Sequence, residues 1–191
     1  MKLSISIMMH PTRKKNIPYL KGKLGDIPIA MDNKNEIWDT CSRAWKLYDK
    51  NADYHCVIQD DGIIGNDFYN RAIKEIEAHP NHAFSFYYGN RKEHREVARQ
   101  GITKGGVKTD WISWGVAICL PTKHIESMID FCNKLPDGYK KHDDTMIAKY
   151  LQSIKMPVWY PLPSLVDHRT ENTLIDENGA VGRKAYKFIG E

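Results

Sequence analysis

The sequence comprises 191 residues, of which 41% are hydrophobic and 27% are charged, as in an ordinary soluble globular protein with one domain as the default. It contains no run of about 18 apolar residues, which excludes a membrane-spanning helix, and its apolar start, Met1–Ile7, is too short for a secretion signal. The net charge of +4 at pH 7 permits a phosphate-rich partner without requiring one. The four cysteines show no Cys-x-x-Cys spacing and fall within apolar patterns, so we expect reduced core thiols in a cytoplasmic protein.

The first 65 residues predict three strands that each end in polar residues. Leu3–Met9 alternates and then becomes wholly apolar, as a central strand would, and stops at a basic, proline-marked loop, His10–Lys15. Ile27–Met31 predicts a second strand that ends at Asp32, and a run with one apolar face at helical spacing begins after Asn35. A buried strand then passes through Val57 and Ile58 and ends abruptly in Asp60, Asp61 and Gly62.

The remaining residues continue the alternation of helices and strands. A helix that buries Phe68 and Ile76 is followed by strands at Ala83–Tyr88 and Trp111–Leu120, and Asn66 or Asp67 is its candidate cap. Between those strands lies Gly89–Asp110, a long, polar and basic connection in which a part can be helical and which we expect to be functional or mobile. Thr122 is a candidate cap for the next helix, His142-Asp143-Asp144 opens another, and Val158–Tyr160 predicts a last short strand.

This alternation predicts a single-domain α/β fold with a mostly parallel sheet flanked by helices. Ligand sites in such sheets lie outside the carboxyl ends of the strands. His10–Arg13, Asp32 and the Asp60-Asp61 pair all follow predicted strands. We therefore expect one crevice to gather them.

The Asp60-Asp61 pair is the strongest single indication of chemistry. Two ionised carboxylates side by side repel each other, so a chain that keeps both at a strand end usually supplies a cation. A divalent ion such as Mg²⁺ or Mn²⁺ prefers these oxygen ligands and retains open positions for substrate phosphates. The alternative is an ordinary turn, because Asp and Gly are common turn residues.

The order of four features resembles the GT-A class of nucleotide-sugar glycosyltransferases, most strongly the small bacterial and phage-type members that carry Gln-Asp-Asp in place of Asp-x-Asp. Asp60-Asp61 resembles the family's metal-binding acidic motif, and Trp114-Gly115 resembles the loop beside the donor sugar. Asp143-Asp144 resembles the family's acidic pair at a helix start, and His168 resembles its C-terminal metal ligand. The segment Gly182–Phe188 is similar to the tail of the small members, whereas Gln59 departs from the motif's first acidic position. The resemblance covers most of the chain. It implies one GT-A-like, Rossmann-related domain over residues 1–191, with a nucleotide-binding half at 1–65 and an acceptor half and tail at 66–191.

For the metal, the resemblance implies Asp61, Asp60 and His168 as ligands of Mn²⁺ or Mg²⁺. Such an ion would stabilise the charge that develops on a leaving nucleotide diphosphate. Asp61 is the first candidate because Gly62 leaves it uncrowded, and Asp60 would contact the ribose or the metal. Arg169 is a candidate fork donor to phosphate. A surface histidine in a proline-rich tail is the alternative interpretation of His168.

For catalysis, Asp143 and Asp144 stand at a predicted helix N-terminus, where an aspartate is in any case a common cap. One of them is a candidate general base that deprotonates the acceptor hydroxyl as it attacks the sugar. The resemblance gives the role of base to Asp144 and the role of orienting the acceptor to Asp143. It assumes inversion at the anomeric carbon.

For the donor, the resemblance implies that the base and ribose of a nucleotide, UDP by default, lie against the first strand ends and a helix arginine. The residues concerned are Pro11, Thr12, Arg13, Asp32 and Arg43. Asp32 is equally well explained as a turn residue. Trp114 is a candidate platform for the donor sugar beside Gly115, although tryptophans are more often core residues.

The predicted function is therefore metal-dependent transfer of a sugar from a nucleotide diphosphate sugar to a hydroxyl acceptor. The basic stretch Arg91–Lys108 would suit a polyanion, so a hydroxylated base in phage DNA is one acceptor candidate, with a polysaccharide or a protein as the others. Two other classes stay open, a nucleotidyltransferase acting on a sugar phosphate and a non-catalytic nucleic-acid-binding module. The first loop has no glycine-rich signature, which disfavours a nucleotidyltransferase. The basic stretch contains no aromatic residue, which disfavours a nucleic-acid-binding module. The sequence does not indicate an oligomeric state.

Overall fold

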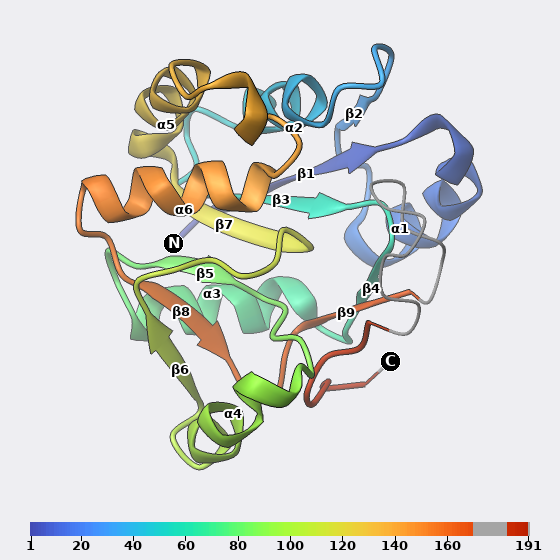
Figure 1. The fold of residues 1–191 in the computed structure, drawn as a ribbon. Coiled ribbons are helices and arrows are strands. Elements are labelled where there is room, and N and C mark those ends of the chain that lie inside the picture. The colour runs from blue at the N-terminus through green and yellow to red at the C-terminus, as the bar shows by residue number, and fades with distance from the viewer. Residues whose placement is uncertain (170–182, 191) are drawn as a thin grey trace.

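A computed structural model describes residues 1–169 and 183–190, and within them the chain forms a seven-stranded mixed sheet and a two-stranded sheet (Figure 1). The order of the large sheet is β2-β1-β3-β7-β5-β8-β6. Its strands are β1 (Leu3–Met9), β2 (Ile29–Met31), β3 (Tyr54–Gln59), β5 (Ala83–Ser85), β6 (Gly106–Thr109), β7 (Ala117–Pro121) and β8 (Val158–Pro161). The small sheet pairs β4 (Gly62–Ile64) with β9 (Val166–His168) in antiparallel fashion.

Five strands of the large sheet run in one direction. β2, β1 and β3 are mutually parallel, and β5 is parallel to β8. β7 is antiparallel to both β3 and β5, and the edge strand β6 is antiparallel to β8. The predicted α/β fold with a mostly parallel sheet is thus confirmed.

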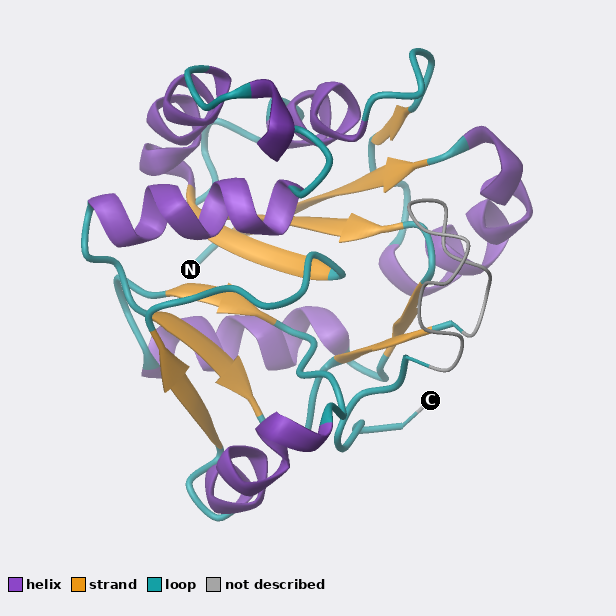
Figure 2. Cartoon of the chain, viewed as in Figure 1, coloured by secondary structure: helices purple, strands orange, loops and turns teal. Residues whose placement is uncertain are grey.

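Helices cover both faces of the sheet (Figure 2). They are α1 (Ile17–Leu24), α2 (Ile37–Trp45), α3 (Phe68–Ala78), α4 (Arg95–Ile102), α5 (Ile125–Asn133) and α6 (Asp143–Ser153). Short 3-10 helices occur at η1 (Pro11–Asn16), η2 (Lys92–His94), η3 (Thr122–His124) and η4 (Asp137–Tyr139). In Figure 1, α2, α5 and α6 lie together on one face of the sheet, whereas α3 lies on the other.

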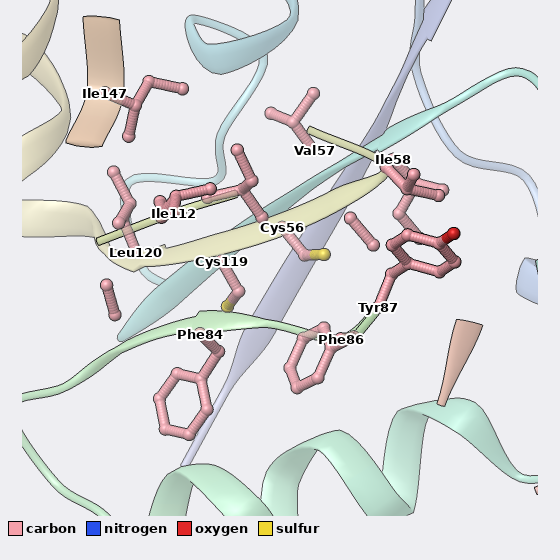
Figure 3. Packing of buried hydrophobic residues seen from close by; sticks show 14 of the residues in the cluster. Cys56, Val57, Ile58, Phe84, Phe86, Tyr87, Ile112, Cys119, Leu120 and Ile147 are labelled. Carbon is pink, nitrogen blue, oxygen red and sulfur yellow. The ribbon is translucent and has the colours of Figure 1, made fainter. Parts of the chain in front are cut away.

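The core lies on both sides of the central strands β3, β7 and β5 (Figure 3). Cys56 and Cys119 face each other in the β3–β7 register, beside Phe84 and Phe86. All four cysteines are buried and unpaired, as expected. In the described part of the chain, none of the helices is both long and apolar enough to cross a membrane.

Several local expectations were wrong, and each failure has a tertiary cause. The loop expected after the first strand is helical through η1 and α1, because Leu20 packs into the core and fixes the segment. The connection 89–110 contains a helix, α4, as its composition allowed, but it also contains the unexpected strand β6, which is held by pairing with β8. The strand expected from Trp111 begins only at Ala117, since the Tyr160 hydroxyl binds the backbone of Trp111 and Ser113 and holds them away from the sheet.

Two expected helix caps also differ. The hydroxyl of Thr122 donates to the carbonyl of Ala52 at 2.6 Å rather than capping α5, and η3 precedes that helix. Asp67 occupies the N-cap of α3 but makes no side-chain cap bond. α6 begins at Asp143 as predicted, with His142 at its N-cap.

Candidate active site

The carboxyl ends of β1 and β3 bring the acidic pair against the first loop. The two strands are parallel in a register that runs from Leu3 opposite Tyr54 to Met8 opposite Gln59, so both end at one edge of the sheet. The backbone N–H of His10, just after β1, donates to Asp60 Oδ2 at 2.6 Å, and Asn16 Nδ2 donates to the Asp60 carbonyl at 2.9 Å. Gly62 suits the tight turn that follows, because a Cβ there would lie 3.1 Å from Ile58 Cγ2. The expected gathering of strand-end residues is therefore present.

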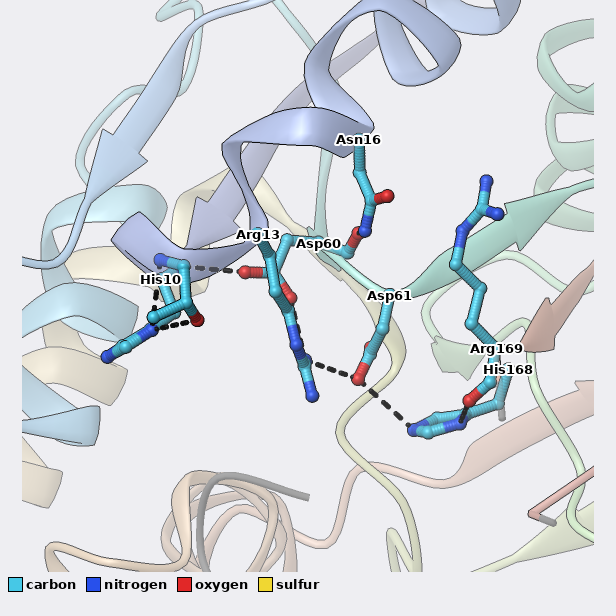
Figure 4. Close-up of polar contacts among 8 residues, drawn as sticks. His10, Arg13, Asn16, Asp60, Asp61, His168 and Arg169 are labelled. Carbon is cyan, nitrogen blue, oxygen red and sulfur yellow. Dashed lines mark hydrogen bonds and ion pairs between the residues drawn. The ribbon is translucent and has the colours of Figure 1, made fainter. Parts of the chain in front are cut away.

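Arg13 is the immediate cation of this pair (Figure 4). Its Nη1 lies 2.9 Å from Asp60 Oδ1 and 2.5 Å from Asp61 Oδ2, and all three side chains are largely buried. Burial alone would lower the pKa of Arg13, but the charges of Asp61 and Asp60 outweigh it and raise the pKa. The guanidinium is therefore permanently charged.

The small sheet places His168 beside Asp61. β9 pairs with β4 so that His168 stands opposite Gly62, and His168 Nε2 lies 3.4 Å from Asp61 Oδ2. His168 Nδ1 lies 2.6 Å from the carbonyl of Arg169, and because a carbonyl only accepts, Nδ1 carries the proton. In a neutral imidazole Nε2 then presents a lone pair to a carboxylate oxygen. A lone pair directed at a carboxylate oxygen is the arrangement in which both atoms can bind one cation.

These donors fit a divalent metal by their chemistry. Asp61 Oδ1 is buried and has no hydrogen-bond partner among the described residues. A metal-ligating histidine commonly donates its other N–H to a backbone carbonyl, as His168 does. The arrangement itself is not closed, since among the described residues no three His, Cys, Asp or Glu side chains converge as a metal-holding group. The guanidinium of Arg13 lies between the two carboxylates instead.

Asp143 is the third buried carboxylate of the site, after Asp60 and Asp61. Its burial, followed by the charge of Asp144, raises its pKa from 3.8 to about 7. Gly115 approaches it closely, because a Cβ there would lie 3.4 Å from Asp143 Oδ1 and 3.0 Å from Gln59 Nε2. A carboxylate with a pKa near neutrality is well matched to general-base work.

Asp144 is turned to its own helix. Its Oδ1 accepts from the backbone N–H of Thr145 at 2.6 Å and from the Thr145 hydroxyl at 3.3 Å. Burial raises its pKa as well. Of the two aspartates, Asp143 lines the cavity described next and Asp144 is not among the described residues that do.

One cavity of about 790 Å³ connects these groups. It extends from the ends of β1 and β2, past Asp60, Asp61 and His168, to the start of α6. Its volume is within the range of about 300–1,000 Å³ that holds a ligand of nucleotide size. The first residues of α2 and Asp143 of α6 line it, and the N-terminal ends of helices favour anions.

The nucleotide end contains only some of the expected residues. Asp32 lines the cavity and accepts from the N–H groups of Lys34 and Asn35 at 3.0 and 2.9 Å. Although burial raises its pKa, these bonds leave it lowered overall. Arg43 Nε donates to Asp39 Oδ2 at 2.8 Å. Among the described residues that line the cavity, Arg13 is present whereas Pro11, Thr12 and Arg43 are not.

Three other candidates lie elsewhere. Trp114 is buried among the rings of Tyr87, Tyr88 and Tyr160 and does not line the cavity within the described lining. The guanidinium of Arg169 lies 4.4 Å from the ring centre of Tyr19 and extends away from Asp61 (Figure 4). The backbone N–H of Arg169 nevertheless donates to the Asp61 carbonyl at 2.9 Å. The described cavity wall also includes no residue of 89–110, because β6 carries that segment to the far edge of the sheet.

Sequence reasoning missed several cavity residues. Gln59 could have been found, because it stands at the end of a predicted strand, whereas His10 was already expected in the crevice. Lys140, Lys141 and Arg183 also line the cavity. Arg183 has a buried Nε without a hydrogen-bond partner among the described atoms. No local signal marks these three basic residues, since only the tertiary fold brings them to the strand ends.

Comparison with known proteins supports the fold. No protein-family model and no curated protein matches the sequence. Among solved structures, the crystal structure of A197 from STIV is similar at 15% identity and a TM-score of 0.52, covering 96% of this chain and 97% of that one. A mutant Drosophila beta-1,4-galactosyltransferase 7 in complex with manganese, UDP-Gal and xylobiose is similar at 9% identity and a TM-score of 0.49, over 96% of this chain and 71% of that one. A putative glucose-1-phosphate thymidylyltransferase from Bacillus anthracis, in complex with a sucrose, gives 11% identity and a TM-score of 0.47 over 81% and 65% of the respective chains. At these identities the likeness concerns the fold alone.

Proposed function

We propose that this protein is a metal-dependent glycosyltransferase that moves a sugar from a nucleotide diphosphate sugar to a hydroxyl acceptor. The observation that carries the proposal is the single cavity that joins Asp60, Asp61 and His168 to the near-neutral carboxyl of Asp143. An anion-stabilising centre and a general base at two points of one cavity are what glycosyl transfer to a hydroxyl requires.

The donor would lie along the strand ends. Its nucleoside, uridine by default, would occupy the end lined by Asp32 and the start of α2, where a carboxylate can accept from a pyrimidine N–H. Its diphosphate would lie at Arg13 and the acidic pair. Asp61, Asp60 and His168 would hold Mn²⁺ or Mg²⁺, which supplies charge stabilisation for the departing diphosphate. Arg183 lines the same cavity and adds a second fork donor for phosphate.

For the acceptor step, we assign the general base to Asp143. It lines the cavity, and its raised pKa lets it accept a proton near neutral pH. Asp144, bonded to Thr145, would hold the start of α6 in place and keep the pKa of Asp143 raised. The base would remove the hydroxyl proton as the hydroxyl oxygen bonds to the anomeric carbon and the diphosphate oxygen leaves. Direct attack of this kind inverts the anomeric configuration.

For the acceptor class, we propose a hydroxyl group on DNA. The support is the group of exposed cations around α4 and β6, namely Arg91, Lys92, Arg95, Arg99, Lys104 and Lys108. Their distance from the donor cavity in the fold suits contact with the backbone of a long acceptor rather than with the reacting group. A polysaccharide or a protein acceptor replaces DNA if the protein does not bind DNA at low salt.

A donor screen tests the proposed function. The protein is incubated with Mn²⁺ and a panel of nucleotide sugars, and free nucleotide diphosphate is measured. We expect release from one donor class, strengthened by the correct acceptor. Release of pyrophosphate from a nucleoside triphosphate and a sugar phosphate would instead identify a nucleotidyltransferase and contradict the proposal.

A further inference from the structure

The acidic pair of the proposed metal site already holds a cation. The Nη1 of Arg13 contacts one oxygen of Asp60 and one of Asp61, at 2.9 and 2.5 Å. The side chains of Arg13, Asp60 and Asp61 are 10%, 4% and 5% exposed. Ion pairs shielded from water in this way are screened far less than surface pairs.

Two other atoms of the site that could bind a metal ion are not satisfied by Arg13. Asp61 Oδ1 is buried and has no hydrogen-bond partner among the described atoms. His168 Nε2 faces Asp61 Oδ2 at 3.4 Å while its Nδ1 is bonded to the Arg169 carbonyl. Asp61 Oδ1 and His168 Nε2 are therefore potential metal ligands, and the positive charge of Arg13 opposes the approach of a second cation to them.

We propose that Arg13 keeps the acidic pair closed to divalent metal in the free protein, and that a nucleotide diphosphate opens it by drawing the guanidinium onto its phosphates. The second half rests on the proposed function, which supplies the diphosphate. A guanidinium binds phosphate oxygens as a bidentate fork, so a diphosphate is a suitable competing partner for it. Metal and donor would therefore bind together, whereas metal alone would bind weakly.

The first test measures Mn²⁺ binding to the whole free protein by electron paramagnetic resonance, without nucleotide. Arg13→Gln removes the charge and keeps a hydrogen-bond donor of similar reach, whereas Arg13→Lys keeps the charge. Arg71→Gln is the matched control, because Arg71 is exposed on α3 and is not among the described residues that line the cavity of the proposed metal site. We expect Arg13→Gln to bind Mn²⁺ between about ten and a thousand times more tightly than the unmodified protein. Arg13→Lys and the control should bind as weakly as the unmodified protein.

Two results would overturn the inference. One is tight Mn²⁺ binding by the unmodified free protein, and the other is no gain in Arg13→Gln. Loss of Arg13 leaves two buried carboxylates unpaired and can unfold the chain. In that event Mn²⁺ should restore folding of Arg13→Gln, seen by circular dichroism, and failure of Mn²⁺ to restore it would equally count against the inference.

The second test adds UDP. Saturating UDP should raise Mn²⁺ affinity by a larger factor in the unmodified protein than in Arg13→Gln, since only the former has a guanidinium to displace. Equal factors in the two proteins would refute the role of the diphosphate. Absence of UDP binding in both would contradict the proposed donor instead, and the nucleotide-free comparison would still decide the role of Arg13.

Discussion

Replacing Asp143 with Asn should stabilise the protein above neutral pH while removing its catalysis. Asp143 is held in a buried site where its pKa is about 7 rather than 3.8. The folded state therefore retains a proton that the unfolded state loses, and stability falls as pH rises from about 4 to about 7. A shift of about three pKa units at about 1.36 kcal/mol each corresponds to about 4 kcal/mol of lost stability at pH 8. Asparagine carries no charge at any pH, so Asp143→Asn escapes this loss.

The assay is urea unfolding of the unmodified protein and Asp143→Asn from pH 4 to pH 8. The difference in the free energy of unfolding should move in favour of the variant by about 4 kcal/mol over that interval. Asp130→Asn, at an exposed position of α5, should show no such trend. The kcat of Asp143→Asn should fall by about 10²–10⁴ with donor affinity nearly unchanged. A difference that does not vary with pH would refute the buried-base reasoning, and a normal kcat in Asp143→Asn with a damaged Asp144→Asn would return the base to Asp144.

Three further predictions concern other parts of the molecule. His55 is fully buried between Ser4 and Ser6, and burial lowers its pKa to about 4. About 3 kcal/mol of the free energy of unfolding should therefore be lost as pH falls from about 6.5 to about 4. In urea titrations, a His55→Gln variant should lack this part of the acid sensitivity. Gly115→Ala should lower kcat by about tenfold or more with little change in melting temperature, because its Cβ would press on Gln59 and Asp143, and unchanged kinetics would show that this contact is unimportant. Changing four exposed residues on and beside α4 to Glu should abolish DNA binding and leave donor affinity intact; they are Arg95, Arg99, Lys104 and Lys108. Filter binding across a salt series is the measurement, and DNA binding equal to that of the unmodified protein would exclude this basic surface.

Much of the site could be predicted because it lies at strand ends. The apolar runs before His10 and Asp60 predict parallel strands, and the rule that ligands bind at their carboxyl ends then brings the two together. Asp143 was a candidate as an acidic residue at a helix start, but the resemblance gave the role of base to Asp144. His168 required the resemblance to a known family, since nothing in its own neighbourhood predicts the pairing of β9 with β4 that sets it beside Asp61.

Contacts between distant segments account for what could not be predicted. The basic loop after β1 gave no hint that Arg13 would bridge both aspartates, because its partners are 47 and 48 residues away. Trp114 stands beside a glycine as a sugar platform would, yet the rings of Tyr87, Tyr88 and Tyr160 enclose it. Whether Asp143 or Asp144 faces the cavity depends on the rotation of α6 about its axis. Two adjacent aspartates do not encode that rotation.

If the Asp61 site acts through a divalent metal, as we propose, removing the metal should abolish catalysis. The protein is treated with EDTA, dialysed, and assayed for release of nucleotide diphosphate from its donor before and after Mn²⁺ is restored. We expect no turnover without metal, full recovery with Mn²⁺, and no recovery in Asp61→Asn, which lacks the charged ligand. Full activity of the unmodified protein in EDTA would contradict this proposal.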